Sequence, residues 1–128
     1  IRLWLLLETE RKTMIAEAFI GSMVGDYLFQ NDWQALNKKK SSFVCGVHAL
    51  IWTLAVLVCS WTWNPWLALW LYATHFAIDR TQFVNWYMTV AGQEGFRDNL
   101  KPWSSIAVDN TLHLVTILVG YKALAYFG

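Results

Sequence analysis

The feature that most constrains this 128-residue chain is a long stretch without charge: residues 41–78 contain no Asp, Glu, Lys or Arg. A membrane-spanning helix needs about 20 mainly apolar residues, so the stretch has room for nearly two. Asn64-Pro65 lies near its middle, where a turn between two helices is expected. Because a soluble core helix is rarely apolar on all sides over such a length, the stretch predicts an integral membrane protein.

The composition agrees with this class and excludes another. Charged residues make up 15% of the chain and hydrophobic residues 56%, whereas about 25% of the residues in a soluble domain are charged. Ten basic residues against nine acidic ones leave a net charge of +1. This charge is too small for a surface that neutralises phosphates, so we exclude a nucleic-acid-binding protein.

The apolar segments predict an all-α fold, a polytopic transmembrane four-helix up-and-down bundle. Residues 14–128 would form this domain, with helices over about residues 14–30, 43–60, 65–88 and 104–127. Residues 1–13 form a short N-terminal segment, which we expect at the membrane interface because its apolar part is too short to span.

The connecting segments predict the topology of the bundle. Six basic residues fall in the first and third connections, against four on the other side, and this difference favours a cytoplasmic position for these two connections. They are Lys38, Lys39, Lys40, Arg80, Arg97 and Lys101. We expect the lipid bilayer as one partner. Other membrane subunits could bind the small-residue face formed by Gly21 and Gly25, or the Trp-rich surface.

All three histidines of the chain fall inside predicted spans. His75 and Asp79 are four residues apart and share a helix face, and Asp109 and His113 do the same on the last helix. Because the two helices would be antiparallel neighbours, the mirrored order places the two histidines at one depth. His48 lies near the start of its predicted helix, on the same side of the bundle.

The first predicted helix adds polar residues at this depth. Asp26 and Gln30 lie at its end, and Ser22 lies one turn before Asp26. Ionisable residues inside a membrane are costly unless they have partners, so we expect the polar residues of all four helices to converge in one layer.

Two interpretations of this layer remain open. In the first, it binds one divalent transition metal, Zn or Fe, and supports hydrolysis of a membrane-associated substrate. The metal ligands would be His48, His75, His113, Asp79 and Asp109. Asp79 or Asp109 could also act as the catalytic base, and Asp26, Gln30 and Ser22 would orient ligands or bind substrate. In the second, the layer is a structural hydrogen-bond network in a non-enzymatic subunit or accessory protein of a larger assembly.

Several motifs resemble a known family. They are Gly25-Asp26-Tyr27-Leu28-Phe29-Gln30-Asn31-Asp32-Trp33 with Asn37-Lys38-Lys39-Lys40, the blocks Thr74–Asp79 and Asp109–His113, and His48. Over about residues 14–121 the chain resembles a family of small bacterial and phage membrane proteins, domain of unknown function 3307. The resemblance implies a bacterial inner membrane or a phage-encoded equivalent. The family's pattern of His and Asp residues in helices is similar to that of membrane-bound metal-dependent hydrolases. Ser22 is a departure, because the family usually has His at that place.

Overall fold

A computed structural model describes residues 2–127, and every regular element in this range is a helix. The four long helices are α1 (Arg2–Met23), α3 (Ser42–Ser60), α4 (Pro65–Arg80) and α7 (Trp103–Phe127). A π-helical turn, η1 (Val24–Leu28), continues α1. The short helices are α2 (Asp32–Asn37), α5 (Phe83–Val90) and α6 (Glu94–Asn99). The predicted all-α class is therefore confirmed.

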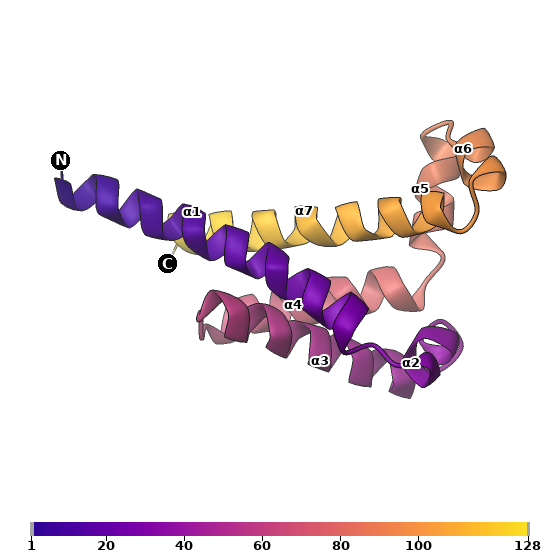
Figure 1. The fold of residues 1–128 in the computed structure, drawn as a ribbon, viewed down its shortest axis with the longest axis horizontal. Coiled ribbons are helices and arrows are strands. Elements are labelled where there is room, and N and C mark those ends of the chain that lie inside the picture. Colours follow the sequence, from indigo (N-terminus) through magenta and orange to yellow (C-terminus); the bar gives the residue numbers. More distant parts are fainter. Residues whose placement is uncertain (1, 128) are drawn as a thin grey trace.

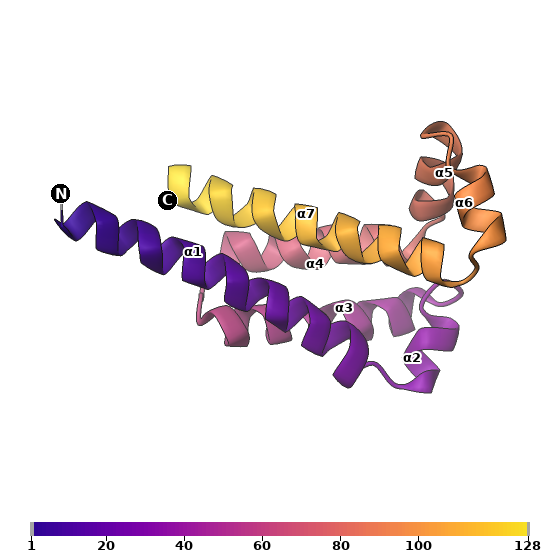
Figure 2. The ribbon, with the colours of Figure 1, turned by 45° about the horizontal axis from the view of Figure 1, so that its top comes forward.

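The long helices form a four-membered ring in which chain neighbours run in opposite directions (Figure 1). Helices α1 and α4 each pack against both α3 and α7. We call the end with the two termini and the α3–α4 turn the terminal end. The opposite end, formed by residues 24–42 and 81–102, is the loop end. There α5 runs across the long direction of the bundle (Figures 1 and 2).

Local sequence signals explain where α3 and α4 begin. The Ser41 hydroxyl accepts a hydrogen bond from the Val44 amide at 3.4 Å. The Asn64 side-chain oxygen accepts from the amides of Trp66 at 2.9 Å and Leu67 at 3.1 Å. Such caps satisfy amides that have no partner in the first turn of a helix. The predicted turn at Asn64-Pro65 is therefore present, with Pro65 in the first turn of α4.

The structure divides the helix predicted over residues 65–88. Helix α4 ends at Arg80, and α5 starts at Phe83. At this break the Lys39 ammonium donates hydrogen bonds to the backbone carbonyls of Asp79 at 3.0 Å and Thr81 at 3.2 Å. These bonds satisfy carbonyls that the end of a helix leaves without partners. The break depends on a lysine distant in sequence, and neither Gly nor Pro marks it.

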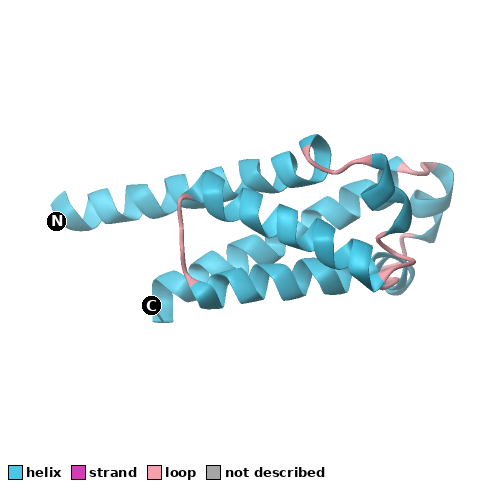
Figure 3. Cartoon of the chain, turned by 90° about the horizontal axis from the view of Figure 1, so that it is seen from below, coloured by secondary structure: helices cyan, strands magenta, loops and turns pink. Residues whose placement is uncertain are grey.

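The first helix also differs from its predicted range of 14–30. Helix α1 begins at Arg2, so residues 2–13 are helical, and η1 ends at Leu28. An ion pair between Glu8 and Lys12, 3.4 Å long and one turn apart, lies on this added part. The N-terminal part of α1 projects beyond the rest of the bundle (Figure 3).

The small-residue face of α1 is used inside the chain. A Cβ atom added at Gly21 would lie 2.7 Å from the carbonyl oxygen of Ala55, and one added at Gly25 would lie 3.0 Å from the Cα of Trp52. Both glycines therefore permit close packing of α1 and η1 against α3. The binding of another membrane subunit to this face stays a prediction.

Only one helix within residues 2–127, α3, combines the length and the apolar composition of a membrane span. Its mean hydropathy reaches 2.1, and half of that window is buried. A single helix of this kind also occurs in the cores of soluble proteins, so the four predicted spans are not shown. The bundle nevertheless exposes large apolar side chains along α3, among them Leu50, Leu54 and Val58.

Candidate metal centre

A group of buried polar side chains lies inside the bundle, toward its loop end. We call this group the polar cluster; it consists of Asp26, Lys38, His48, His75, Asp79 and His113. The three imidazoles and Asp79 are fully buried. An apolar core on the terminal side and a smaller one formed by Ile78, Val84 and Met88 flank the cluster. Charge is therefore held where apolar side chains exclude water.

Asp79 is the centre of the cluster. Its Oδ2 atom lies 3.0 Å from His75 Nε2 and 3.2 Å from His48 Nε2. Its Oδ1 atom accepts a hydrogen bond from His113 Nε2 at 3.1 Å. The rings of His75 and His113 stack with centroids 4.0 Å apart. The mirrored sequence motifs thus bring the two histidines to the same depth, on facing helices.

The side chains of the cluster form two groups that could each hold a metal ion. Asp26, His48 and His75 form the first, and His75, Asp79 and His113 form the second, with the ligand atoms of each group within 4.8 Å of one another. In the first group, Asp26 Oδ1 lies 3.2 Å from His48 Nε2 and 3.8 Å from His75 Nε2. Imidazole and carboxylate donors of this kind suit Zn or Fe.

The hydrogen-bond partner of His48 explains why a cation fits between these groups. His48 Nδ1 lies 3.2 Å from the amide oxygen of Gln34, an acceptor, so Nδ1 carries the proton. In the neutral ring, the Nε2 lone pair then faces the carboxylates of Asp26 and Asp79. Two acceptors cannot bond to each other directly, but both can bind one cation.

Several atoms of the cluster lack hydrogen bonds of good geometry within residues 2–127. They are His48 Nε2, both ring nitrogens of His75, Asp79 Oδ2, Asp26 Oδ2 and His113 Nδ1. Buried polar atoms are nearly always paired, and leaving one unpaired costs about 1–3 kcal/mol. Three of these atoms, on His48, His75 and Asp79, face one another, which is the arrangement that a bound cation satisfies.

Lys38 supplies a positive charge to the same cluster. Its ammonium lies 3.1 Å from Asp79 Oδ2, and its side chain is 17% exposed. Burial lowers the pKa of Lys38, but the neighbouring carboxylates, first that of Asp79, raise it more, so the pKa lies above its usual value. Lys38 therefore remains charged at neutral pH.

Trp52 and Ser22 support the cluster without joining it. The indole of Trp52 stacks on His75 with ring centroids 4.1 Å apart, and its Nε1 donates to Ser22 Oγ at 3.1 Å. Ser22 was expected to orient ligands or bind substrate. In the structure, the Ser22 hydroxyl instead bonds to the indole of Trp52, and this indole stacks on His75.

Asp109 and Gln30 lie at the edge of the cluster. Asp109 Oδ2 is 3.4 Å from His113 Nε2, and its side chain is 22% exposed. Asp109 was predicted as a ligand, but its ion-pair contact is to His113 alone among the three histidines in the described residues. Asp26, predicted in a supporting role, lies closer to the potential ligands. Gln30 donates weakly to the Asp26 carbonyl, at 3.4 Å.

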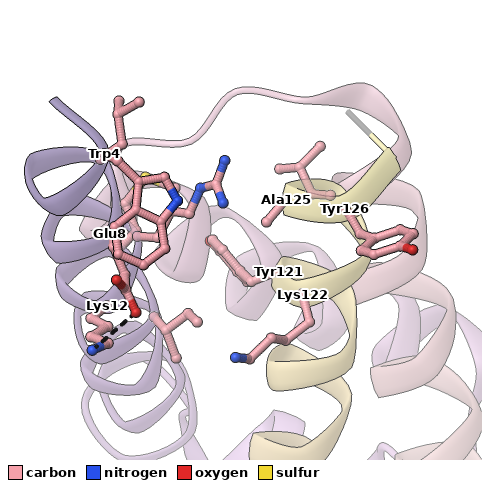
Figure 4. A pocket seen from close by; sticks show the side chains of 12 residues that line it. Trp4, Glu8, Lys12, Tyr121, Lys122, Ala125 and Tyr126 are labelled. Carbon is pink, nitrogen blue, oxygen red and sulfur yellow. Dashed lines mark ion pairs between the residues drawn. The ribbon is translucent and has the colours of Figure 1, made fainter. Parts of the chain in front are cut away.

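A cavity of about 260 Å³ at the loop end connects the cluster to the surface. Its lining includes Lys38, Asp79 and Asp109, with residues of the α4–α5 connection and the first turns of α7. A larger cavity, about 420 Å³, lies at the terminal end between α1 and α7 (Figure 4). It contains no residue of the polar cluster.

Comparison with known proteins identifies the family of the chain. The family model described as "Protein of unknown function (DUF3307)" matches residues 14–127. The chain belongs to the DUF3307 family. No curated protein and no solved structure matches the chain. The DUF3307 match includes every residue of the polar cluster and leaves residues 1–13 outside it.

Three partners in this DUF3307 chain were missed from the sequence. They are Lys38, Gln34 and Trp52; of these, only Lys38 was used in the sequence analysis, as one of the basic residues that indicate the topology. Lys38 and Gln34 reach the cluster because α2 folds back against α3. Their place within the family motif around Asp26 and Asn37 was the available signal.

Proposed function

We propose that this chain is an integral membrane protein whose polar cluster binds one divalent transition metal and hydrolyses a membrane-associated substrate. The observation that carries the proposal is the convergence of two groups of potential ligands that share His75: Asp26, His48 and His75, and His75, Asp79 and His113. His113 would orient Asp79 through its hydrogen bond.

A metal ion in this position would act as a Lewis acid and lower the pKa of a bound water to about 7. Asp109 faces the cavity and could accept the proton of that water. The water oxygen would attack the carbonyl carbon or phosphorus of the substrate. The bond to the leaving oxygen would break, and that oxygen would take the proton from Asp109.

The membrane part of the proposal is supported by the apolar surface. Phe43, Leu50, Leu54 and Val58 are exposed along α3. Trp61 and Trp63 in the α3–α4 turn and Trp66 at the start of α4 are each more than half exposed. Tryptophans collect at membrane–water interfaces. The excess of basic residues at the loop end favours the cytoplasmic side for that end. Extraction of the chain from membranes by carbonate alone would contradict this location.

Elemental analysis tests the metal centre. We expect about one equivalent of Zn or Fe in protein purified without a chelator or a metal-affinity resin. The His75→Ala/His113→Ala double variant should lose it, and so should the milder His75→Gln variant, because the donor set is then incomplete. Asp98→Asn, an exposed change on α6, is the control and should keep the metal. Background metal in folded wild-type protein, judged by circular dichroism, would refute the metal centre and the hydrolase.

The second candidate function is a non-enzymatic membrane subunit. One observation favours it: the Lys38 ammonium already lies against Asp79 and supplies a cation without a metal. In this case the alanine variants lose stability only, and the elemental analysis finds no metal in the wild-type protein.

A further inference from the structure

The cavity at the loop end has a polar floor made by the metal centre. Asp79 and Asp109 lie on this floor with Lys38, whose ammonium is mostly buried. Lys39 lines the wall, where its ammonium bonds to two backbone carbonyls of the α4–α5 connection. Lys38 is therefore the cation held beside the reactive position.

A bound metal ion would make the floor of the cavity positive. Lys38 and Lys39 line the cavity together with Asp79 and Asp109, so the charges of the lining cancel. A divalent ion in the polar cluster would add two positive charges beside this lining. In a partly buried site such a change acts strongly on a charged ligand. The bound metal therefore favours an anion in the cavity.

Two of the residues that line the cavity are apolar, Val84 on α5 and Ile106 on α7, and Ile106 is 37% exposed. The exposed side chains of Trp86 and Val90 lie on the other side of α5 from Val84, because the helix has about 3.6 residues per turn. Figures 1 and 2 show α5 lying across the end of the bundle, the direction that a helix takes in the plane of a membrane surface.

The size of the cavity limits what enters it. Its volume of about 260 Å³ is below the about 300–1,000 Å³ of pockets that enclose a whole drug-sized ligand. A single charged group therefore fits inside, while the rest of the ligand remains outside the cavity, against exposed apolar side chains such as Ile106.

We propose that this cavity binds the phosphate group of an anionic amphiphile, held between Lys38 and the metal of the polar cluster. This inference rests on the proposed function and names its substrate class. With the metal bound, the P–O ester bond of this phosphate would be the bond that is hydrolysed. Lys38 is a binding residue that neutralises the phosphate oxygens.

Calorimetric titration of zinc-loaded and zinc-stripped protein in a neutral detergent tests the proposal. The probes are inorganic phosphate and decyl phosphate. We expect decyl phosphate to bind the zinc-loaded protein at least tenfold more tightly than inorganic phosphate does, and to lose at least tenfold in affinity when zinc is removed. Zinc content is measured separately in every sample.

Lys38→Met should weaken decyl phosphate binding by about tenfold or more, because a charge-assisted contact is lost. Lys38→Arg keeps the charge and should keep most of the affinity. The matched control is Lys12→Met, since Lys12 lines the other cavity and its side chain is 77% exposed. Circular dichroism identifies a variant that does not fold. If Lys38→Met does not fold, the affinity of Lys38→Arg is compared with that of the wild type.

The outcomes separate the two proposals. Protein that holds zinc but binds neither probe overturns the phosphate site and leaves the metal centre intact. Equal binding of the two probes also overturns it, because the ligand would then be free phosphate. If wild type and Lys38→Met bind decyl phosphate equally, the measured heat comes from transfer of the probe into detergent micelles, and this result also overturns the site. Protein without zinc overturns the metal centre, and the phosphate site with it.

Discussion

The two ends of the bundle place their charged groups in opposite ways. Toward the loop end, charge is buried: Lys38 and three imidazoles surround Asp79, which is fully buried. At the terminal end, the ion pair between Glu8 and Lys12 lies at the rim of an open cavity, with both side chains well exposed (Figure 4). The interior there is apolar, apart from a hydrogen bond between Ser60 and Tyr121.

This difference favours the loop end as the place of the proposed site. An exposed ion pair contributes little and can be gained or lost easily. A buried cluster of ionisable groups costs several kcal/mol per charge to desolvate, so stability alone does not favour it over an apolar core. The desolvation cost at the loop end is consistent with a site for a metal and an anion. The terminal end, by contrast, packs as an apolar core next to that site.

The strongest test of this comparison is neutralising one carboxylate at each end. Asp79→Asn should destabilise the protein by about 3–5 kcal/mol, because it leaves Lys38 buried without its partner. It should also abolish metal binding. Glu8→Gln should cost only about 0.3–0.5 kcal/mol, the value of an exposed pair one turn apart. Thermal unfolding and metal content measure both effects, and equal losses at the two ends would break the comparison.

A methyl group added to a glycine at each end sharpens the comparison of the two ends. Gly25→Ala places a Cβ atom 3.0 Å from the Cα of Trp52, and overpacking of this kind costs about 1–3 kcal/mol. Because Trp52 stacks on His75, we also expect weaker metal binding. Gly120→Ala meets the Trp70 side chain at 2.7 Å; Trp70 is 40% exposed but would lose its hydrogen bond to the Thr116 carbonyl if it moved. The free energy of unfolding and the zinc affinity of both variants are compared. Unchanged zinc affinity in Gly25→Ala would show that the position of Trp52 does not affect the metal site.

The smallest difference in stability between the two ends is expected from two serine hydroxyls. Ser22→Ala removes the hydrogen bond to Trp52, and Ser60→Ala removes the one to Tyr121 together with a bond to the Val56 carbonyl; each variant should cost about 1 kcal/mol. Only Ser22→Ala should also weaken zinc binding. Its effect should be smaller than the about 10–100-fold seen when a direct partner of a ligand is removed. A similar change in zinc affinity in Ser60→Ala would show that this measurement reports stability alone.

The depth of the histidines could be predicted because helix periodicity is local. Positions four apart share a face, and antiparallel neighbours reverse the order of the motif, so His75 and His113 had to meet if their helices packed together. The turn at Asn64-Pro65 was predictable for the same reason: the cap and the proline act within one turn.

The end of α4 and the roles of Lys38 and Gln34 could not be predicted in this way. Lys39 bonds to carbonyls at Asp79 and Thr81, some forty residues away in the chain. Gln34 meets His48 because a short helix folds back onto α3. Pattern and propensity describe neighbours within a few turns, and these contacts join separate elements.

The sequence by itself determined that the chain is all-helical, that it belongs to its family, and that its histidines share one level with Asp79. These properties follow from periodicity, caps and motif spacing. Only the tertiary structure decided which carboxylates face the imidazoles, placing Asp26 among them and Asp109 at the cavity. It also decided that Lys38 is buried and that α1 packs through Gly21 against α3. The reason is that rotation of each helix about its axis, and the path of each connection, are settled by packing against the other elements.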